Sequence, residues 1–264
     1  MSPNPNPRAP LPIKVLAGLG VVLIVLPLAG LIQRAAWSSL FEDLSSQSAL
    51  DALQLSLLTS LAATALALIL GLPLAWVLAR SKLRGRSIIR ALVLVPMVLP
   101  PVVGGVALLS AFSLRSPLGG WLHDVFGLQL TFAPAGVILA ETFVAMPFFV
   151  LTVEAAIRQS DPRVEQIAAT LGASPATVMR RVTLPTVAPA IGAGAVLAWA
   201  RALGEFGATV TFAGNVAGRT RTLPLAVYLA LESDPNAAIA LSLVLLVVSF
   251  AVLVSQRERW WNNQ

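Results

Sequence analysis

The chain has 264 residues, of which 57% are hydrophobic and only 11% are charged, against about 25% charged in a typical soluble domain. This composition excludes an ordinary soluble domain and favours a membrane protein. The net charge is +6, but the basic residues cluster between apolar segments, so we relate the charge to membrane topology and expect no nucleic-acid partner. There is no Cys and only one His, His123, so we expect no disulfide, no metal site and no cofactor.

Six apolar segments come close to the roughly 20 residues that a helix needs to cross the hydrocarbon core. Pro and Gly interrupt the third and the fifth of them, so these two are predicted more from length than from hydropathy. We therefore expect an all-α, polytopic membrane protein with six transmembrane helices. In chain order the segments are 13–32, 53–79, 88–112, 133–153, 187–211 and 237–254.

The basic residues orient these segments, because loops on the cytoplasmic side of a membrane are enriched in Lys and Arg. With both chain ends inside, only Arg34, Arg115, Arg219 and Arg221 fall on the outer side. The cytoplasmic side then carries Arg8, Lys14, Arg80, Lys82, Arg84, Arg86, Arg90, Arg158, Arg163, Arg180, Arg181, Arg257 and Arg259.

The chain divides into four parts by composition. The first apolar segment could be read as a cleaved signal peptide, but it exceeds the usual apolar core of about 7–15 residues, and we expect an uncleaved anchor. We expect a Pro-rich cytoplasmic tail at 1–12, the first transmembrane helix and an outer loop at 13–48, a transport domain at 49–255 that contains a polar loop at 161–185, and a cytoplasmic tail at 256–264.

The polar loop has the local signals of two short helices joined by an elbow. Asp161 can cap a helix over 163–171, with a Pro at its first position. Gly172 can take the left-handed conformation that ends a helix, and Ser174 can cap a second helix, which we expect to end at Leu184-Pro185. From these signals alone, the loop is either a stiff handle for a second protein or an amphipathic segment on the lipid surface.

The residues of this loop resemble a known family. Glu165, Ala168 and Gly172, followed by Leu184-Pro185, are similar to the Glu-Ala-Ala loop of permease subunits of bacterial ABC importers, although Gln166 and Ile167 depart from its usual small residues. The resemblance covers the chain from about residue 49 to the last apolar segment and implies the type I importer fold. It implies that the loop couples to an ATPase through Glu165, Ala168, Ala169, Gly172, Ala173 and Ser174.

The chain has no Gly-x4-Gly-Lys-Ser/Thr loop that could bind nucleotide phosphates. If transport is driven by ATP, the ATPase must therefore be a separate chain, and this subunit is not itself an enzyme. The resemblance implies a homodimer of this chain in the lipid bilayer, with two copies of an ABC ATPase subunit.

Several residues inside the apolar segments are candidates for a translocation pathway or gate. Pro100, Pro101 and Gly104 break the third segment, and such breaks are tolerated where protein or a wet cavity satisfies the backbone. They indicate either a pathway-lining helix or a simple proline kink.

Arg201 and Glu205, four residues apart in the fifth segment, form either a structural ion pair or a positive site for an anion. Gly204 and Gly207 would permit close helix approach. Glu141, in the fourth segment, should face the bundle, but its partner cannot be named from the sequence.

The outer loop after the fifth segment carries Asn215, Arg219 and Arg221 among turn residues and threonines. These side chains would suit an oxyanion or acidic groups on a docking protein, and a plain solvated loop is the alternative.

The sequence Arg201-Ala-Leu-Gly-Glu-Phe-Gly207, with Gly214-Asn215 and Gly218-Arg-Thr-Arg-Thr222, resembles the molybdate/sulfate branch of the permease family. Its second part is more similar to the molybdate members, which implies import of molybdate, with tungstate, across the bacterial inner membrane from a periplasmic molybdate-binding protein. Sulfate or thiosulfate import is the alternative. A proton-coupled secondary transporter that uses Glu141 and Glu205 is a remote one, because no internal repeat is visible.

Overall fold

The computed structural model describes residues 10–261 as helices and short connections, without a strand. The tails that the sequence predicts fall partly on residues 1–9 and 262–264, which lie outside the described residues. The helices are α1 (Leu11–Gln33), α2 (Leu40–Ser45), α3 (Gln47–Arg80), α4 (Arg86–Val98), α5 (Pro101–Phe112), α6 (Pro117–Phe126), α7 (Pro134–Gln159), α8 (Pro162–Thr170), α9 (Pro175–Val178), the π-helical turn η1 (Met179–Thr183), α10 (Leu184–Leu203), α11 (Gly207–Phe212), α12 (Leu223–Ser233) and α13 (Pro235–Trp261).

Within the described residues, five helices are long and apolar enough to cross a membrane: α1, α3, α7, the continuous stretch from α9 through α10, and α13. A sixth span is present if α4 and α5 are counted together. The all-α fold with six candidate spans agrees with the sequence prediction. Residues 256–261, which we expected in a tail, continue α13.

The third apolar segment does not form one straight helix. α4 and α5 meet at an angle of 118°, and the bend falls at Leu99 and Pro100, which both have extended backbone conformations. A residue before a proline is pushed out of the helical region, and both Leu99 and Pro100 precede one. The bend is therefore a consequence of the Pro100-Pro101 pair and is much larger than a simple proline kink.

The second helix of the polar loop does not end at Leu184-Pro185, as we expected. It passes through η1 into α10 without a break. Pro185 cannot donate a backbone hydrogen bond, and a helix can continue past such a residue when the preceding turn widens. The Leu184 N–H bonds to the Met179 carbonyl, which is the wider π-helical pattern.

The main core lies between α3, α7 and α10. Phe149 of α7 is fully buried, and a Cβ added at Gly71 of α3 or at Gly194 of α10 would lie 2.8 Å or 3.1 Å from its ring. The two glycines thus let both neighbouring helices approach the same aromatic side chain. This packing fixes the three long helices relative to one another.

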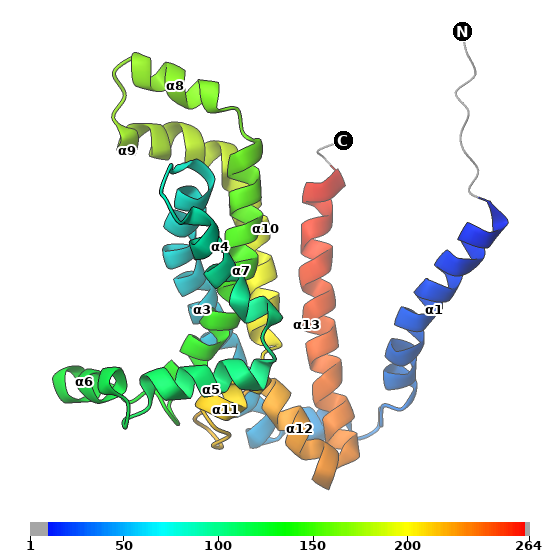
Figure 1. Cartoon of the computed structure of the whole chain (residues 1–264). Coiled ribbons are helices and arrows are strands. Elements are labelled where there is room, and N and C mark those ends of the chain that lie inside the picture. Colours follow the sequence, from blue (N-terminus) through cyan, green and yellow to red (C-terminus); the bar gives the residue numbers. More distant parts are fainter. Residues whose placement is uncertain (1–9, 262–264) are drawn as a thin grey trace.

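Figure 1 shows how the remaining elements are placed around this core. α8 and α9 lie across one end of the bundle, which we call the elbow end, and α5, α6, α11 and α12 lie at the opposite end. α13 stands beside the bundle, and α1 stands further out, with none of its residues buried.

Candidate functional site

The α8–α9 segment forms the elbow that its sequence predicts. The Asp161 carboxylate accepts a hydrogen bond from the Arg163 N–H at 2.9 Å, and the Ser174 hydroxyl accepts one from the Thr177 N–H at 3.2 Å. Gly172 joins the two helices with a φ of +87°, a conformation that is unstrained only for glycine. Both predicted caps and the predicted glycine turn are confirmed.

The elbow is fastened to the bundle through Glu165. Its Oε1 accepts hydrogen bonds from the Arg80 guanidinium at 3.3 Å and from the Thr183 hydroxyl at 3.1 Å. The same Arg80 nitrogen donates to Ser160 at the end of α7, to its hydroxyl at 2.7 Å and to its carbonyl at 3.1 Å. One carboxylate and one guanidinium therefore connect α8 with the ends of α3 and α7 and with the start of α10.

The opposite side of α8 carries an exposed apolar stripe. Val164 and Ile167 of α8 and Leu171, the C-cap residue that follows it, are 52%, 60% and 83% exposed, and their spacing follows one side of the helix. These three residues were not among those predicted to couple. Of the predicted residues besides Glu165, Ala168 and Ala173 are half-buried, whereas Ala169, Gly172 and Ser174 are exposed. An exposed stripe of this kind is typical of a surface that binds a protein or a membrane.

A second charged cluster at the elbow end was not predicted from the sequence. Glu154 of α7 is 1% exposed and lies 2.7 Å from the Arg158 guanidinium and 3.5 Å from that of Arg90 on α4. Arg158 also donates to the Leu78 carbonyl of α3 at 3.0 Å. The cluster joins three helices. The sequence signal was the acidic Glu154 four residues before a basic residue, a spacing that predicts an ion pair on a helix.

Arg201 and Glu205 form an ion pair, with 2.6 Å between nitrogen and oxygen. The Glu205 side chain is 1% exposed, and its other oxygen accepts a hydrogen bond from the Ala208 N–H at 2.8 Å. Both carboxylate oxygens are thus engaged, one with the last turn of α10 and one with the first turn of α11. The side chain of Arg201 is 28% exposed, so the arginine is the more accessible partner.

Glu141 of α7 faces the bundle, as predicted, and is 1% exposed. The structure also supplies the partner that the sequence could not name: the Thr59 hydroxyl of α3 donates to Glu141 Oε1 at 3.1 Å. This contact ties α3 to α7 in the half of the bundle nearer the opposite end.

The start of α5, where Pro and Gly residues break the third apolar segment, lies against α11. A Cβ added at Gly207 would lie 2.6 Å from the Pro101 side chain, and one added at Gly105 would lie 2.5 Å from Thr211. A Cβ added at Gly104 would lie 3.2 Å from the Phe143 ring of α7. Close approach through Gly207 is confirmed.

Gly204 behaves differently from Gly207. A Cβ there would meet only the Ala200 carbonyl, at an ordinary 3.6 Å. Gly204 therefore ends α10 without serving a close contact in the described part of the chain.

The loop between α11 and α12 is structured by its own residues. Asn215 Oδ1 accepts a hydrogen bond from Arg221 Nε at 3.1 Å, and the Thr220 hydroxyl accepts one from the Val216 N–H at 2.9 Å. Thr220 is fully buried, whereas Arg219 is exposed. The loop therefore holds Asn215 and Arg221 against each other and leaves Arg219 facing outward.

Comparison with known proteins defines the class. The model of the family "Binding-protein-dependent transport system inner membrane component" matches residues 67–258, and the chain belongs to this family. A bacterial alginate ABC transporter has the same fold, with a TM-score of 0.71, 19% identity and coverage of 94% of each chain.

Several relatives are permease proteins of molybdenum or sulfate transport systems. A Mycobacterium tuberculosis molybdenum transport system permease protein, ModB, is 47% identical over 91% of this chain and 90% of its own length. The Escherichia coli ModB is 37% identical over 78% and 91%, and the E. coli sulfate transport system permease protein CysT is 34% identical over 89% and 86%. These similarities confirm the resemblance to the molybdate/sulfate branch and to its molybdenum permeases.

Proposed function

We propose that this chain is the permease subunit of an ATP-driven importer that moves molybdate, and tungstate as a close analogue, across the inner membrane. The observation that supports molybdate as the substrate is the 47% identity to a molybdenum transport permease over nine-tenths of both chains. The identity to a sulfate permease is 34%. Sulfate or thiosulfate is the alternative substrate, and the similarity to CysT favours it over any other anion.

In this proposal both chain ends and the elbow end face the cytoplasm. Two copies of the chain form the pathway between them, two ATPase subunits bind their elbows, and a periplasmic molybdate-binding protein docks on the opposite end. The excess of basic residues in the loops at the elbow end supports this orientation. ATP is hydrolysed on the separate ATPase chains.

The elbow is the element through which force would reach the bundle. Closure of the ATPase pair on ATP would pull the two elbows together, and the Glu165–Arg80 contact would pass the displacement to α3, α7 and α10 at once. The exposed residues Val164, Ile167 and Leu171 would provide the apolar contact with the ATPase. A stiff, multiply anchored lever is required for this step, because a flexible loop would absorb the displacement.

We assign the translocation pathway to residues at the α4–α5 bend and the α10–α11 break: Pro100, Pro101, Gly104, Arg201, Gly204 and Glu205. The engaged oxygens of Glu205 favour a structural role for its carboxylate. The accessible Arg201 is then the residue able to attract an anion. We assign binding-protein docking to Asn215, Arg219 and Arg221, of which the outward-facing Arg219 is the first candidate.

The coupling role is tested by a charge placed in the apolar stripe. Leu171→Glu adds a carboxylate to the most exposed residue of the stripe. Gln166→Glu adds the same charge to an exposed residue of α8 that does not belong to the stripe. We expect the first variant to lose co-purification with the ATPase and the second to keep it. Equal co-purification of both would contradict docking through this face.

The substrate is tested by uptake of radiolabelled molybdate into vesicles that hold the chain, its ATPase and its binding protein. We expect uptake that needs ATP, that tungstate inhibits, and that excess sulfate leaves unchanged. Strong inhibition by sulfate would favour the alternative substrate. Uptake that survives ATP depletion but stops when the proton gradient collapses would favour a secondary transporter.

A further inference from the structure

A basic cavity of about 500 Å³ opens at the elbow end, outside the elbow and outside the proposed pathway. It lies where the connection between α3 and α4 passes the end of α7. The residues that matter for its chemistry are Ser81, Lys82, Arg86, Ser87, Arg90 and Arg158, and no acidic side chain lines it.

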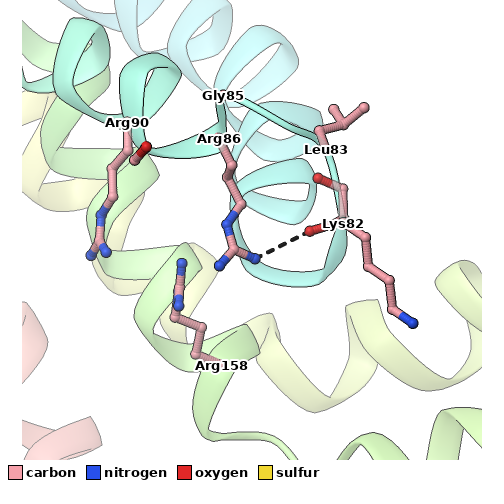
Figure 2. A pocket seen from close by; sticks show the side chains of 8 residues that line it. Lys82, Leu83, Gly85, Arg86, Arg90 and Arg158 are labelled. Carbon is pink, nitrogen blue, oxygen red and sulfur yellow. Dashed lines mark hydrogen bonds between the residues drawn. The ribbon is translucent and has the colours of Figure 1, made fainter.

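Guanidinium groups from two elements point into the same space. Figure 2 shows the end of Arg86, from α4, pointing toward the end of Arg158, from α7, with Arg90 beside them and Lys82 turned outward. Glu154 lies on the buried side, 2.7 Å from Arg158 and 3.5 Å from Arg90, whereas Arg86 donates only to a backbone oxygen, that of Ser81, at 3.1 Å. The one carboxylate thus pairs with two of the three guanidinium groups, and Arg86 has no anionic partner among the described residues.

The start of α4 adds two further features that suit an anion. This helix of 13 residues begins after Gly85 without a side-chain cap and without an acidic residue in its first turn, so the positive end of its dipole is not neutralised locally. The Ser81 hydroxyl in the cavity wall is buried and has no hydrogen-bond partner in the described structure. The cavity therefore offers cations, the positive end of a helix dipole and an unused hydroxyl together.

We propose that this cavity binds an oxyanion of the phosphate type, held between Arg86 and Arg158 at the first turn of α4. Arg is well suited to this, because its planar guanidinium binds phosphate oxygens in pairs. Two sources share this chemistry: the headgroup of an anionic phospholipid and free phosphate in the cytoplasm. Leu83, which lines the cavity, and Ile88, which follows the lining residue Ser87, are both exposed and would receive the acyl chains of a lipid. The location on the cytoplasmic side rests on the proposed orientation.

The test measures binding to the purified full-length chain and needs no transport, so its failure is distinct from failure of the proposed function. One arm counts bound phosphatidylglycerol by native mass spectrometry, with phosphatidylcholine as the zwitterionic reference. The other arm measures binding of radiolabelled inorganic phosphate in a neutral detergent. Preference for phosphatidylglycerol identifies a lipid site, and saturable phosphate binding identifies a free-anion site.

Arg86→Gln is the decisive variant, and Arg84→Gln is its matched control. Arg84 belongs to the same connection and is exposed but does not line the cavity, so both variants remove one positive charge. We expect Arg86→Gln to weaken binding about tenfold, the loss typical of one charge-assisted contact, and Arg84→Gln to change it less than about twofold. Arg86→Lys should recover part of the loss.

Two results would overturn the proposal. One is an absence of saturable binding in both arms, together with equal retention of the anionic and the zwitterionic lipid. The other is an equal effect of the two Gln variants, which would mean that only the total charge of the connection matters. Thermal unfolding of each variant, with midpoints unchanged from the parent, shows that the binding measurements compare folded proteins.

Discussion

Arg80 and Glu165 are 85 positions apart in the chain, yet their side chains lie 3.3 Å apart where the end of α3 meets the elbow. Both are largely buried, with 15% and 19% of the side chain exposed. The pair is the most direct connection between the surface proposed to bind the ATPase and the core of the bundle. Four predictions follow from this contact and from the packing around the breaks in the helices.

Arg80→Ala should uncouple transport more than it destabilises the fold. The loss of stability should be only about 1 kcal/mol, because the Glu165 carboxylate keeps the hydrogen bond from Thr183 and some contact with solvent. Loss of the ion pair frees α8 from α3 and α7, so we expect ATP hydrolysis by the assembled importer to continue while uptake per ATP falls severalfold. Arg163→Ala, a change at an exposed residue of the same elbow, is the control. Equal uptake per ATP in both variants would contradict transmission through Arg80.

Gly172→Ala should weaken the elbow although the space around Gly172 is open. No atom lies within 4 Å of an added Cβ, but the φ of +87° is unfavourable for any residue with a side chain, at a cost of roughly 1–2 kcal/mol. The expected result is weaker co-purification with the ATPase and faster proteolysis between α8 and α9. Gly18→Ala in α1, where an added Cβ also meets nothing and φ is not positive, should change neither measurement.

Gly207→Ala should disturb the contact between α5 and α11, whereas Gly204→Ala should not. A Cβ at Gly207 would lie 2.6 Å from the Pro101 side chain, and a rigid ring cannot move aside, so we expect a loss of about 1–3 kcal/mol. The Cβ at Gly204 would lie 3.6 Å from its nearest neighbour, the Ala200 carbonyl. Thermal unfolding in detergent compares the two variants, and similar midpoints would contradict the packing.

Removal of one partner of the Arg201–Glu205 pair should be more harmful than removal of both. Glu205→Ala leaves Arg201 without its counter-charge and the Ala208 N–H without an acceptor, a loss of about 3–5 kcal/mol for a buried pair. The double variant Arg201→Ala/Glu205→Ala should unfold at a higher temperature than Glu205→Ala alone.

The double variant also separates the two interpretations of Arg201. If the pair is only structural, a double variant that folds should also transport. If Arg201 attracts the passing anion, the folded double variant should have a raised KM for uptake, and Arg201→Lys with Glu205 intact should keep most of the affinity.

The local features of the elbow could be predicted from the sequence, because each depends on neighbouring residues. A side-chain cap needs an acceptor two or three positions before an N–H, and a left-handed turn needs a glycine, so Asp161, Ser174 and Gly172 were sufficient. The prediction failed at Pro185, where a widened turn satisfied the backbone and the helix continued. A proline marks a position without a donor, but only the surrounding structure decides whether the chain bends there or accommodates it.

The membrane spans and their number were determined by the sequence for a similar reason: hydropathy and length act along the chain. The folding of the third segment into two helices at 118° followed from adjacent prolines, but the size of the angle depends on the packing of α5 against α11.

The tertiary structure decided which charges meet. The sequence assigned Arg80, Arg86 and Arg158 only to a side of the membrane, because a topological charge bias carries no information on partners. In the folded chain Arg80 binds Glu165, Arg90 joins Arg158 at Glu154, and Arg86 lines a basic cavity without an acidic partner among the described residues. The Arg80–Glu165 and Arg90–Glu154 pairs join residues 85 and 64 positions apart, and their energy depends on distance and burial, which exist only once the helices have packed.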